Sequence, residues 1–372
     1  MSEASGTPRV LHIHGSLAPG NPQAERCVRL IEAFGGRLRH IMVAADGEFG
    51  ALAGLGKGVS CERRAGFPPF QGLPTPGRLQ RVARAMVDHH LVLTYGRAGI
   101  GAALAHTSFS RVHALPPLIH HEDGSDESPA ARRKPGSKWL RRLGLGKAAG
   151  VVVTNETMEE AALVDWQQPM GRVKRIADGV DAERFAARAK PDAMARLLKR
   201  PGEQWIGCFA RFDGSEKLVP LIEALASLEG HWHLVLVGDG PSRREVEAAA
   251  ARCAVDHRVH FAPTVPDRAR AMALFDIFAA PGGTEPLPAT VIEAMAAGKP
   301  VIGLDFGEGD SALAPANAAL DGGALPVLAG DDGLRQAIGA DNRRKALADF
   351  DEVAMISAYR RLYASAMGRS TI

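Results

Sequence analysis

Two carboxylates, Glu285 and Glu293, lie on either side of an expected junction between a loop and a helix. The apolar run 277–280 before the loop predicts a buried strand, and residues 289–297 predict a short helix that ends at Gly298. The first N–H groups of a helix lack partners and favour an anion such as phosphate. A carboxylate beside them would instead accept hydrogen bonds from hydroxyls. Phosphate together with a polyol indicates a sugar nucleotide.

These residues need a scaffold of parallel strands whose carboxyl ends meet at one edge. Short apolar segments alternate with helical patterns, first in one half of the chain and again in the other. The expected strands are 10–14, 41–44, 91–95, 117–120, 151–154 and 172–176, then 205–210, 234–237, 259–261, 277–280 and 301–302. The expected helices are 23–34, 79–87, 218–228, 245–253, 268–274, 289–297 and 353–367, and residues 47–76 have no clear pattern. The alternation predicts an α/β fold of two doubly wound, Rossmann-like domains that face each other across a cleft.

The length of 372 residues is sufficient for two domains. We place the N-terminal domain at 1–181 and the C-terminal domain at 182–350, with a polar interdomain link at 182–201. A helix in 351–372 is expected to cross back to the N-terminal domain. The net charge of +3 gives no support to a nucleic-acid binder.

The lack of a recognisable targeting signal and the spacing of the cysteines lead us to expect a cytoplasmic protein, with peripheral contact with the membrane as a further expectation. The first ten residues are polar and lack a signal-peptide core, and no apolar run approaches the roughly 20 residues of a membrane span. The four cysteines are far apart in the sequence and have no paired spacing, which indicates reduced thiols.

Four segments together carry a family resemblance. They are Glu285-x7-Glu293 followed by AMAAGKPVI, Phe209-Ala210-Arg211 with Lys217 six residues later, the run LVLVGDGP at 234–241, and DGVDAERF at 178–185. In this order and spacing the chain resembles the retaining glycosyltransferases of family 4, which have the GT-B fold. The resemblance implies a hexosyltransferase that uses a nucleoside-diphosphate sugar as donor.

Arg211 and Lys217 are expected to meet the negative charge on the departing diphosphate. The arginine offers a planar, two-pronged donor and the lysine a mobile point charge. Fixed cations of this kind make a metal ion unnecessary, and the resemblance implies metal independence as well. The simpler alternative is a surface ion pair with Asp213 or Glu216.

By resemblance, Glu285 contacts the donor sugar and Glu293 holds the two ribose hydroxyls. Pro288 stands where the family has a residue with an N–H group, so we expect the amides of Ala289 and Thr290 to bind the diphosphate. The alternatives are a loop residue that caps the helix at its N-terminal end for Glu285, and a buried helix carboxylate satisfied by neighbouring backbone for Glu293. As a pair, the two carboxylates also suit acid/base hydrolysis.

Four further positions are assigned by resemblance. Gly20 lets the backbone approach the diphosphate, Gly238 belongs to the donor-binding run, and backbone near Phe261 reads the base. His121 faces the donor sugar or the acceptor hydroxyl. The cluster 120–124 could instead ligate a metal, but no distant cysteine or histidine has a matching spacing.

The segment 132–147 holds seven basic residues and no acidic ones, with Trp139, Leu140 and Leu143 between them. It is either a solvated helix face or a surface for anionic lipid or a lipid-linked acceptor. We expect retaining transfer to a hydroxyl of a glycan or lipid-linked acceptor in surface polysaccharide or lipopolysaccharide biosynthesis. A sugar-nucleotide epimerase and a non-catalytic GT-B binding module are the alternatives.

Overall fold

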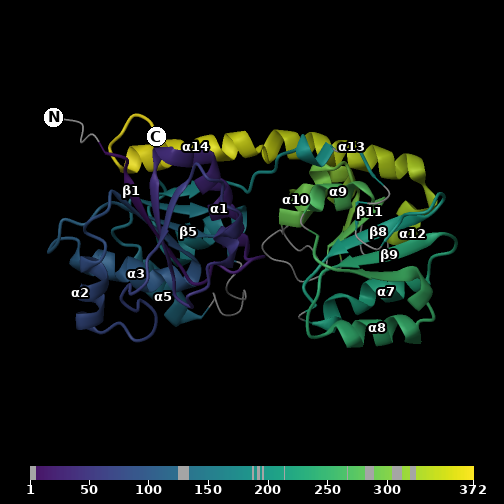
Figure 1. The fold of residues 1–372 in the computed structure, drawn as a ribbon, viewed down its shortest axis with the longest axis horizontal. Helices are drawn as coiled ribbons and strands as arrows, with labels where there is room; N and C mark the ends of the chain where they lie inside the picture. Colours follow the sequence, from purple (N-terminus) through teal and green to yellow (C-terminus); the bar gives the residue numbers. More distant parts are fainter. Residues whose placement is uncertain are drawn as a thin grey trace. The chain divides into compact units, whose positions relative to one another are not determined.

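The computed structural model describes residues 6–372 except 125–133, 187, 191–192, 195–196, 213, 266, 281–288, 304–311 and 319–323, and except the side chain of Lys217. The chain forms two compact units, each built around its own sheet (Figure 1). The first unit comprises residues 1–178 together with 354–372, and the second comprises residues 179–353.

The first unit is a seven-stranded parallel sheet with the order β3-β2-β1-β4-β5-β6-β7. The strands are β1 (Arg9–His14), β2 (Arg39–Ala44), β3 (Ser60–Arg63), β4 (Leu91–Tyr95), β5 (Leu118–Glu122), β6 (Gly150–Val153) and β7 (Val173–Arg175). The helices are α1 (Pro22–Phe34), α2 (Pro76–Arg84), α3 (Gly96–Phe109), α5 (Pro135–Gly144), α6 (Glu156–Glu160) and α14 (Glu352–Ala366).

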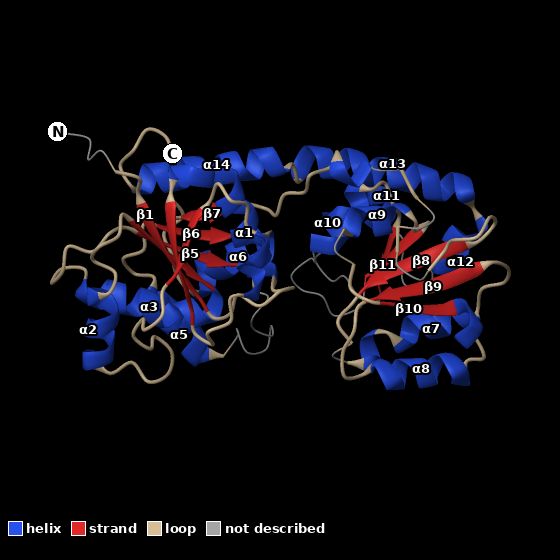
Figure 2. Ribbon diagram, in the orientation of Figure 1, coloured by secondary structure: helices blue, strands red, loops and turns tan. Residues whose placement is uncertain are grey.

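Helices cover both faces of this sheet (Figure 2). Successive side chains of β1 alternate between two cores, because side chains of a strand point to opposite faces. Leu11 and Ile13 pack on the face of α3, whereas Val10 packs on the face of α1 and α14. Tyr363 of α14 is buried, and its ring lies 5.8 Å from that of Phe34 in α1.

The second unit is a five-stranded parallel sheet with the order β10-β9-β8-β11-β12. Its strands are β8 (Gln204–Phe209), β9 (Trp232–Val237), β10 (Val259–Ala262), β11 (Ile277–Ala280) and β12 (Val301–Gly303). The helices are α7 (Val219–Ala226), α8 (Arg243–Arg252), α9 (Arg268–Ala273), α10 (Ala289–Ala296), α11 (Pro315–Ala318), α12 (Ala324–Gly330) and α13 (Asp332–Asp349). The strand order reverses between β8 and β11, and open α/β sheets bind ligands at the carboxyl ends of such strands.

The predicted class, an α/β protein with two Rossmann-like parallel sheets, is confirmed. The expected polar link at 182–201 is wrong, because Phe185 and Met194 are buried in the core of the second unit. The edge strand β3 and the helices α3 and α13 were not expected from the sequence. No helix among the described residues is long and apolar enough to span a membrane.

Candidate functional site

Arg211 lies two residues beyond β8, at the reversal point of the second sheet. Its side chain is exposed, and it forms no ion pair with Glu216, whereas Asp213 lies outside the described residues. A short 3-10 turn, Ser215–Lys217, follows and leads into α7. The side chain of Lys217 is not described, so only the backbone of this second predicted cation is placed.

Glu293 lies on α10, and Glu285 falls within the undescribed residues 281–288 that connect β11 to α10. Glu293 is 8% exposed, and its carboxylate is held by Arg268 on α9. Nη2 of Arg268 lies 2.6 Å from Oε1, and Nε lies 2.9 Å from Oε2. The sequence offered burial of Glu293 only as the alternative to ribose binding, with neighbouring backbone as the partner. The partner is instead the side chain of Arg268, 25 positions away in the chain, which the sequence did not reveal.

Ala289 and Thr290 are the first two residues of α10, and both are partly buried. Their N–H groups belong to the first turn, where a helix has no partner of its own for its N–H groups. The sequence predicted a helix over 289–297, and α10 is described from Ala289 onwards. The preceding residues are not described, so the shape of the anion site around these amides stays a prediction.

Gly238 follows β9 immediately and has a φ of 144°. A Cβ at this position would collide with the carbonyl oxygen of Ala210, so only glycine fits beside the chain that leaves β8. Phe261 lies on the neighbouring strand β10 and is partly buried. The Arg243 guanidinium lies over its ring at 5.2 Å, a cation–π contact that the sequence did not reveal.

In the first unit, Gly20 adopts a φ of 77° in the loop between β1 and α1. The next residue, Asn21, caps α1, because its side chain accepts a hydrogen bond from the Ala24 N–H at 3.1 Å. Pro22 occupies the first helical position, as is common. Asn21, directly after Gly20, therefore fixes where the helix begins.

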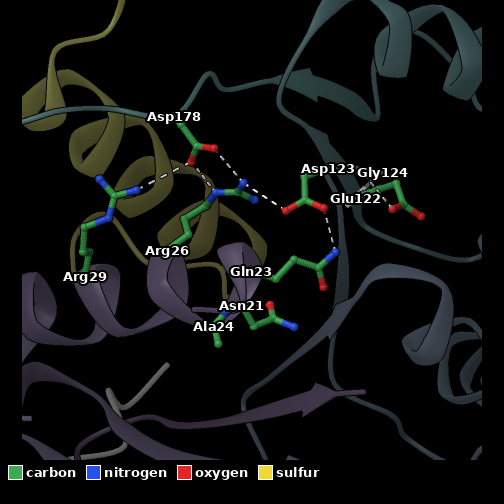
Figure 3. A network of polar contacts seen from close by, with 9 residues as sticks. All are labelled: Asn21, Gln23, Ala24, Arg26, Arg29, Glu122, Asp123, Gly124 and Asp178. Carbon is green, nitrogen blue, oxygen red and sulfur yellow. Dashed lines mark hydrogen bonds and ion pairs between the residues drawn. The ribbon is translucent and has the colours of Figure 1, made fainter. Parts of the chain in front are cut away.

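A buried network joins α1 to Asp123 at the end of β5 and to Asp178, after which the chain enters the second unit (Figure 3). Arg26 donates to Asp123 at 3.1 Å and to Asp178 at 2.8 Å, and Gln23 donates to Asp123 at 2.8 Å. Burial raises the pKa of Asp178, but the Arg26 charge outweighs burial and holds that pKa below its ordinary value. The network fixes the N-terminal half of α1, next to the Gly20 loop.

His121 is 2% exposed, and both of its ring nitrogens have polar contacts within the first unit. Tyr363 approaches Nε2 at 2.8 Å, and Nδ1 lies 3.4 Å from the carbonyl oxygen of Thr94. The ring stacks between Tyr95 and Tyr359. Burial, followed by the neighbouring His120, holds the pKa of His121 well below its ordinary value, so the ring is neutral. The described contacts place His121 in a packed cluster under α14, and its predicted role toward the donor or acceptor stays a prediction.

The candidate ligand atoms of His12, His14 and Cys27 lie within 4.8 Å of one another, which is close enough for the three side chains to hold one metal ion. His12 already contacts Tyr95 at 3.0 Å and His40 at 2.9 Å. Burial raises the pKa of the Cys27 thiol to about 12, so it stays protonated at neutral pH. The described contacts favour a hydrogen-bonded core cluster over a metal site.

The basic run 132–147 does not lie wholly on the surface. Arg141 is 1% exposed and donates to the buried Glu122 at 3.0 Å. On α5, Trp139 and Leu143 are 58% and 52% exposed, and Arg142 lies over the Trp139 ring at 5.6 Å. The exposed part of α5 therefore combines an indole, an aliphatic side chain and a cation.

Comparison with known proteins gives one family match and several relatives. Residues 203–321 match the family described as glycosyl transferases group 1. A segment covering 45% of the chain is 32% identical to 42% of a GDP-mannose-dependent alpha-mannosyltransferase of Mycobacterium tuberculosis. A match that also covers 45% of the chain is 28% identical to 46% of a 2-deoxystreptamine glucosyltransferase of Streptomyces kanamyceticus. The matches thus span less than half the length of either curated relative.

Solved structures resemble nearly the whole chain. Anabaena HepE in complex with UDP has a TM-score of 0.75 at 19% identity, over 96% of this chain and 100% of that one. WaaG, a glycosyltransferase involved in lipopolysaccharide biosynthesis, has a TM-score of 0.64 at 16% identity, over 95% of this chain and 99% of that one. These likenesses confirm the fold class, two Rossmann-like domains of the GT-B type.

Proposed function

We propose that this protein is a glycosyltransferase whose donor is a nucleoside-diphosphate sugar, because residues 203–321 match the family described as glycosyl transferases group 1. The observation that carries the proposal is the location of Arg211, Gly238 and Glu293 inside this matched domain. Arg211 and Glu293 offer complementary groups, an exposed cation for a diphosphate and a carboxylate for a diol. HepE was crystallised with UDP and with UDP-glucose, which supports the donor class.

The chemistry of the leaving group supports a reaction without a metal ion. Loss of the diphosphate builds negative charge, and Arg211 together with Lys217 would stabilise it as fixed cations. The acceptor hydroxyl would attack from the side of the leaving group, and the departing phosphate would take the proton. The donor's anomeric configuration would be retained, and no general base from the protein would be required.

The acceptor is proposed to be a hydroxyl of a glycan or a lipid-linked sugar in surface polysaccharide or lipopolysaccharide biosynthesis. Two kinds of relative support this class. The curated relatives include a lipopolysaccharide core mannosyltransferase of Rhizobium meliloti, and the structural neighbours include WaaG. Exposed Trp139, Leu143 and Arg142 on α5 would give peripheral contact with an anionic membrane surface.

The test is a panel of nucleotide sugars incubated with the protein, with release of the nucleoside diphosphate and the donor-induced shift in melting temperature as readouts. The proposal predicts that at least one donor raises the melting temperature and is consumed when an acceptor is supplied. If no donor does either, the proposal fails. Glu285→Ala should abolish transfer without changing the melting temperature of the free protein, and unchanged activity would refute that site assignment.

A further inference from the structure

The Glu293 carboxylate is engaged through both of its oxygens by one guanidinium. Nη2 of Arg268 lies 2.6 Å from Oε1 and Nε lies 2.9 Å from Oε2, which is the two-pronged geometry of a strong arginine–carboxylate pair. The two side chains differ in exposure, at 10% for Glu293 and 35% for Arg268. The arginine therefore covers the carboxylate and keeps the more accessible position of the two.

A vicinal diol and a guanidinium can bind a carboxylate in the same way. Both groups present two donors, and one donor bonds to each of the two carboxylate oxygens. The two-pronged contact uses the one lone pair of each oxygen that faces the guanidinium, so the ribose and Arg268 cannot both occupy that position. A nucleotide whose diol takes this two-pronged position must displace at least one of the two arginine hydrogen bonds.

We infer that Arg268 is an internal competitor for the ribose site, an inference that rests on the proposed function of Glu293 as the ribose-binding carboxylate. Without nucleotide, Arg268 keeps a buried carboxylate paired, which a buried charge requires. With nucleotide, the two hydroxyls exchange places with the guanidinium. Arg268 thereby lowers the affinity gained from the ribose and limits how tightly the product diphosphate is held.

The experiment compares ribonucleotides with their 2′-deoxy counterparts by calorimetry. The probes are UDP, GDP and ADP, each against its 2′-deoxy form. The readout is the dissociation constant of the 2′-deoxy form divided by that of the ribonucleotide. Loss of a positive charge near the diphosphate changes both constants alike, so the ratio isolates the contribution of the diol. Arg268→Met should raise the ratio about tenfold, because a hydrogen-bonded charged competitor is removed.

Two further variants keep the result interpretable. Arg268→Lys retains the charge but cannot form the two-pronged contact, so its ratio should rise less than that of the methionine variant. Arg270→Met is the matched control, because Arg270 is on the same helix, is 62% exposed and pairs with Asp267 at 3.2 Å. Its ratio should equal that of the unaltered protein.

The outcomes separate this inference from the function on which it rests. If the unaltered protein binds none of the nucleotides, the proposed function fails and the inference fails with it. If the unaltered protein binds a nucleotide but neither Arg268 variant has a higher ratio, only the competition is refuted. A lower ratio in Arg268→Met would show that the arginine assists ribose binding, and it would equally overturn the inference.

Discussion

Arg26 and Asp178 are 152 positions apart in the chain, and their side chains form an ion pair with 2.8 Å between Nη2 and Oδ2. The Arg26 side chain is 6% exposed and that of Asp178 is 18% exposed. Asp178 is the last residue of the first unit before the chain enters the second. The pair therefore attaches α1 to the point where the chain leaves the first unit. The Gly20 loop lies at the N-terminus of the same helix.

Removing Asp178 should destabilise the first unit. In Asp178→Ala, Arg26 keeps Asp123 but loses its other carboxylate, and we expect the free energy of unfolding to fall by about 3 kcal/mol. Urea unfolding followed by circular dichroism measures the loss. The matched control is Arg39→Ala, which breaks an exposed pair with Glu62 and should cost less than about 1 kcal/mol. Equal losses in the two variants would contradict the role assigned to the buried pair.

His14 should make the protein sensitive to mild acid. It is 1% exposed, and neither ring nitrogen has a hydrogen-bond partner among the described residues. Burial lowers the pKa of His14 from 6.5 to about 3, so the unfolded chain binds a proton that the folded protein excludes. Burial of the neutral ring therefore costs no stability above pH 6.5. The free energy of unfolding decreases as the pH falls from 6.5 towards 3.

His14→Phe should remove this dependence while preserving the stack on Tyr95, where the ring centroids are 3.7 Å apart. Relative to the unaltered protein, the variant should gain about 1.4 kcal/mol of stability for each pH unit below 6.5. Urea unfolding at pH 7, 6 and 5 measures the difference. Parallel curves for the two proteins would show that His14 does not titrate between the folded and unfolded states.

The exposed apolar residues of α5 should carry membrane contact if the protein binds a lipid surface. The unaltered protein should float with vesicles that contain anionic lipid, and a double variant with serine at Trp139 and Leu143 should lose most of that binding. Val164→Ser is a suitable control, because Val164 is 64% exposed and lies outside α5. Failure of the unaltered protein to float would refute the membrane proposal, and equal flotation of all three proteins would place the contact elsewhere.

The sequence was most informative where local pattern and tertiary packing agree. Residues 91–95 and 277–280 are apolar runs, and both form fully buried parallel strands. The edge strand Ser60–Arg63 was missed because it is mostly exposed and has no apolar run. Helix α3 was missed because its glycines resemble helix breakers. Gly101 is instead required by packing, since a Cβ there would collide with the Phe70 carbonyl oxygen.

The sequence predicted the site residues that belong to a local motif, but it did not predict the partners that packing brings next to them. The positions of Gly238 and of the first turn of α10 follow from their own segments. The partners of Glu293 and Arg26 do not, because an ion pair between distant residues depends on how elements pack rather than on spacing in the sequence. His121 is a similar case, since Tyr363 is 242 positions away from it and still supplies its closest polar contact.

The most direct test of the central claim is turnover of a nucleotide-sugar panel by the unaltered protein and by Arg211→Met. Arg252→Met is the control, because Arg252 is exposed at the end of α8. Release of a nucleoside diphosphate from one donor, reduced roughly a hundredfold in Arg211→Met and unchanged in Arg252→Met, is the predicted result. Turnover of no donor, or full activity of Arg211→Met, would contradict the account.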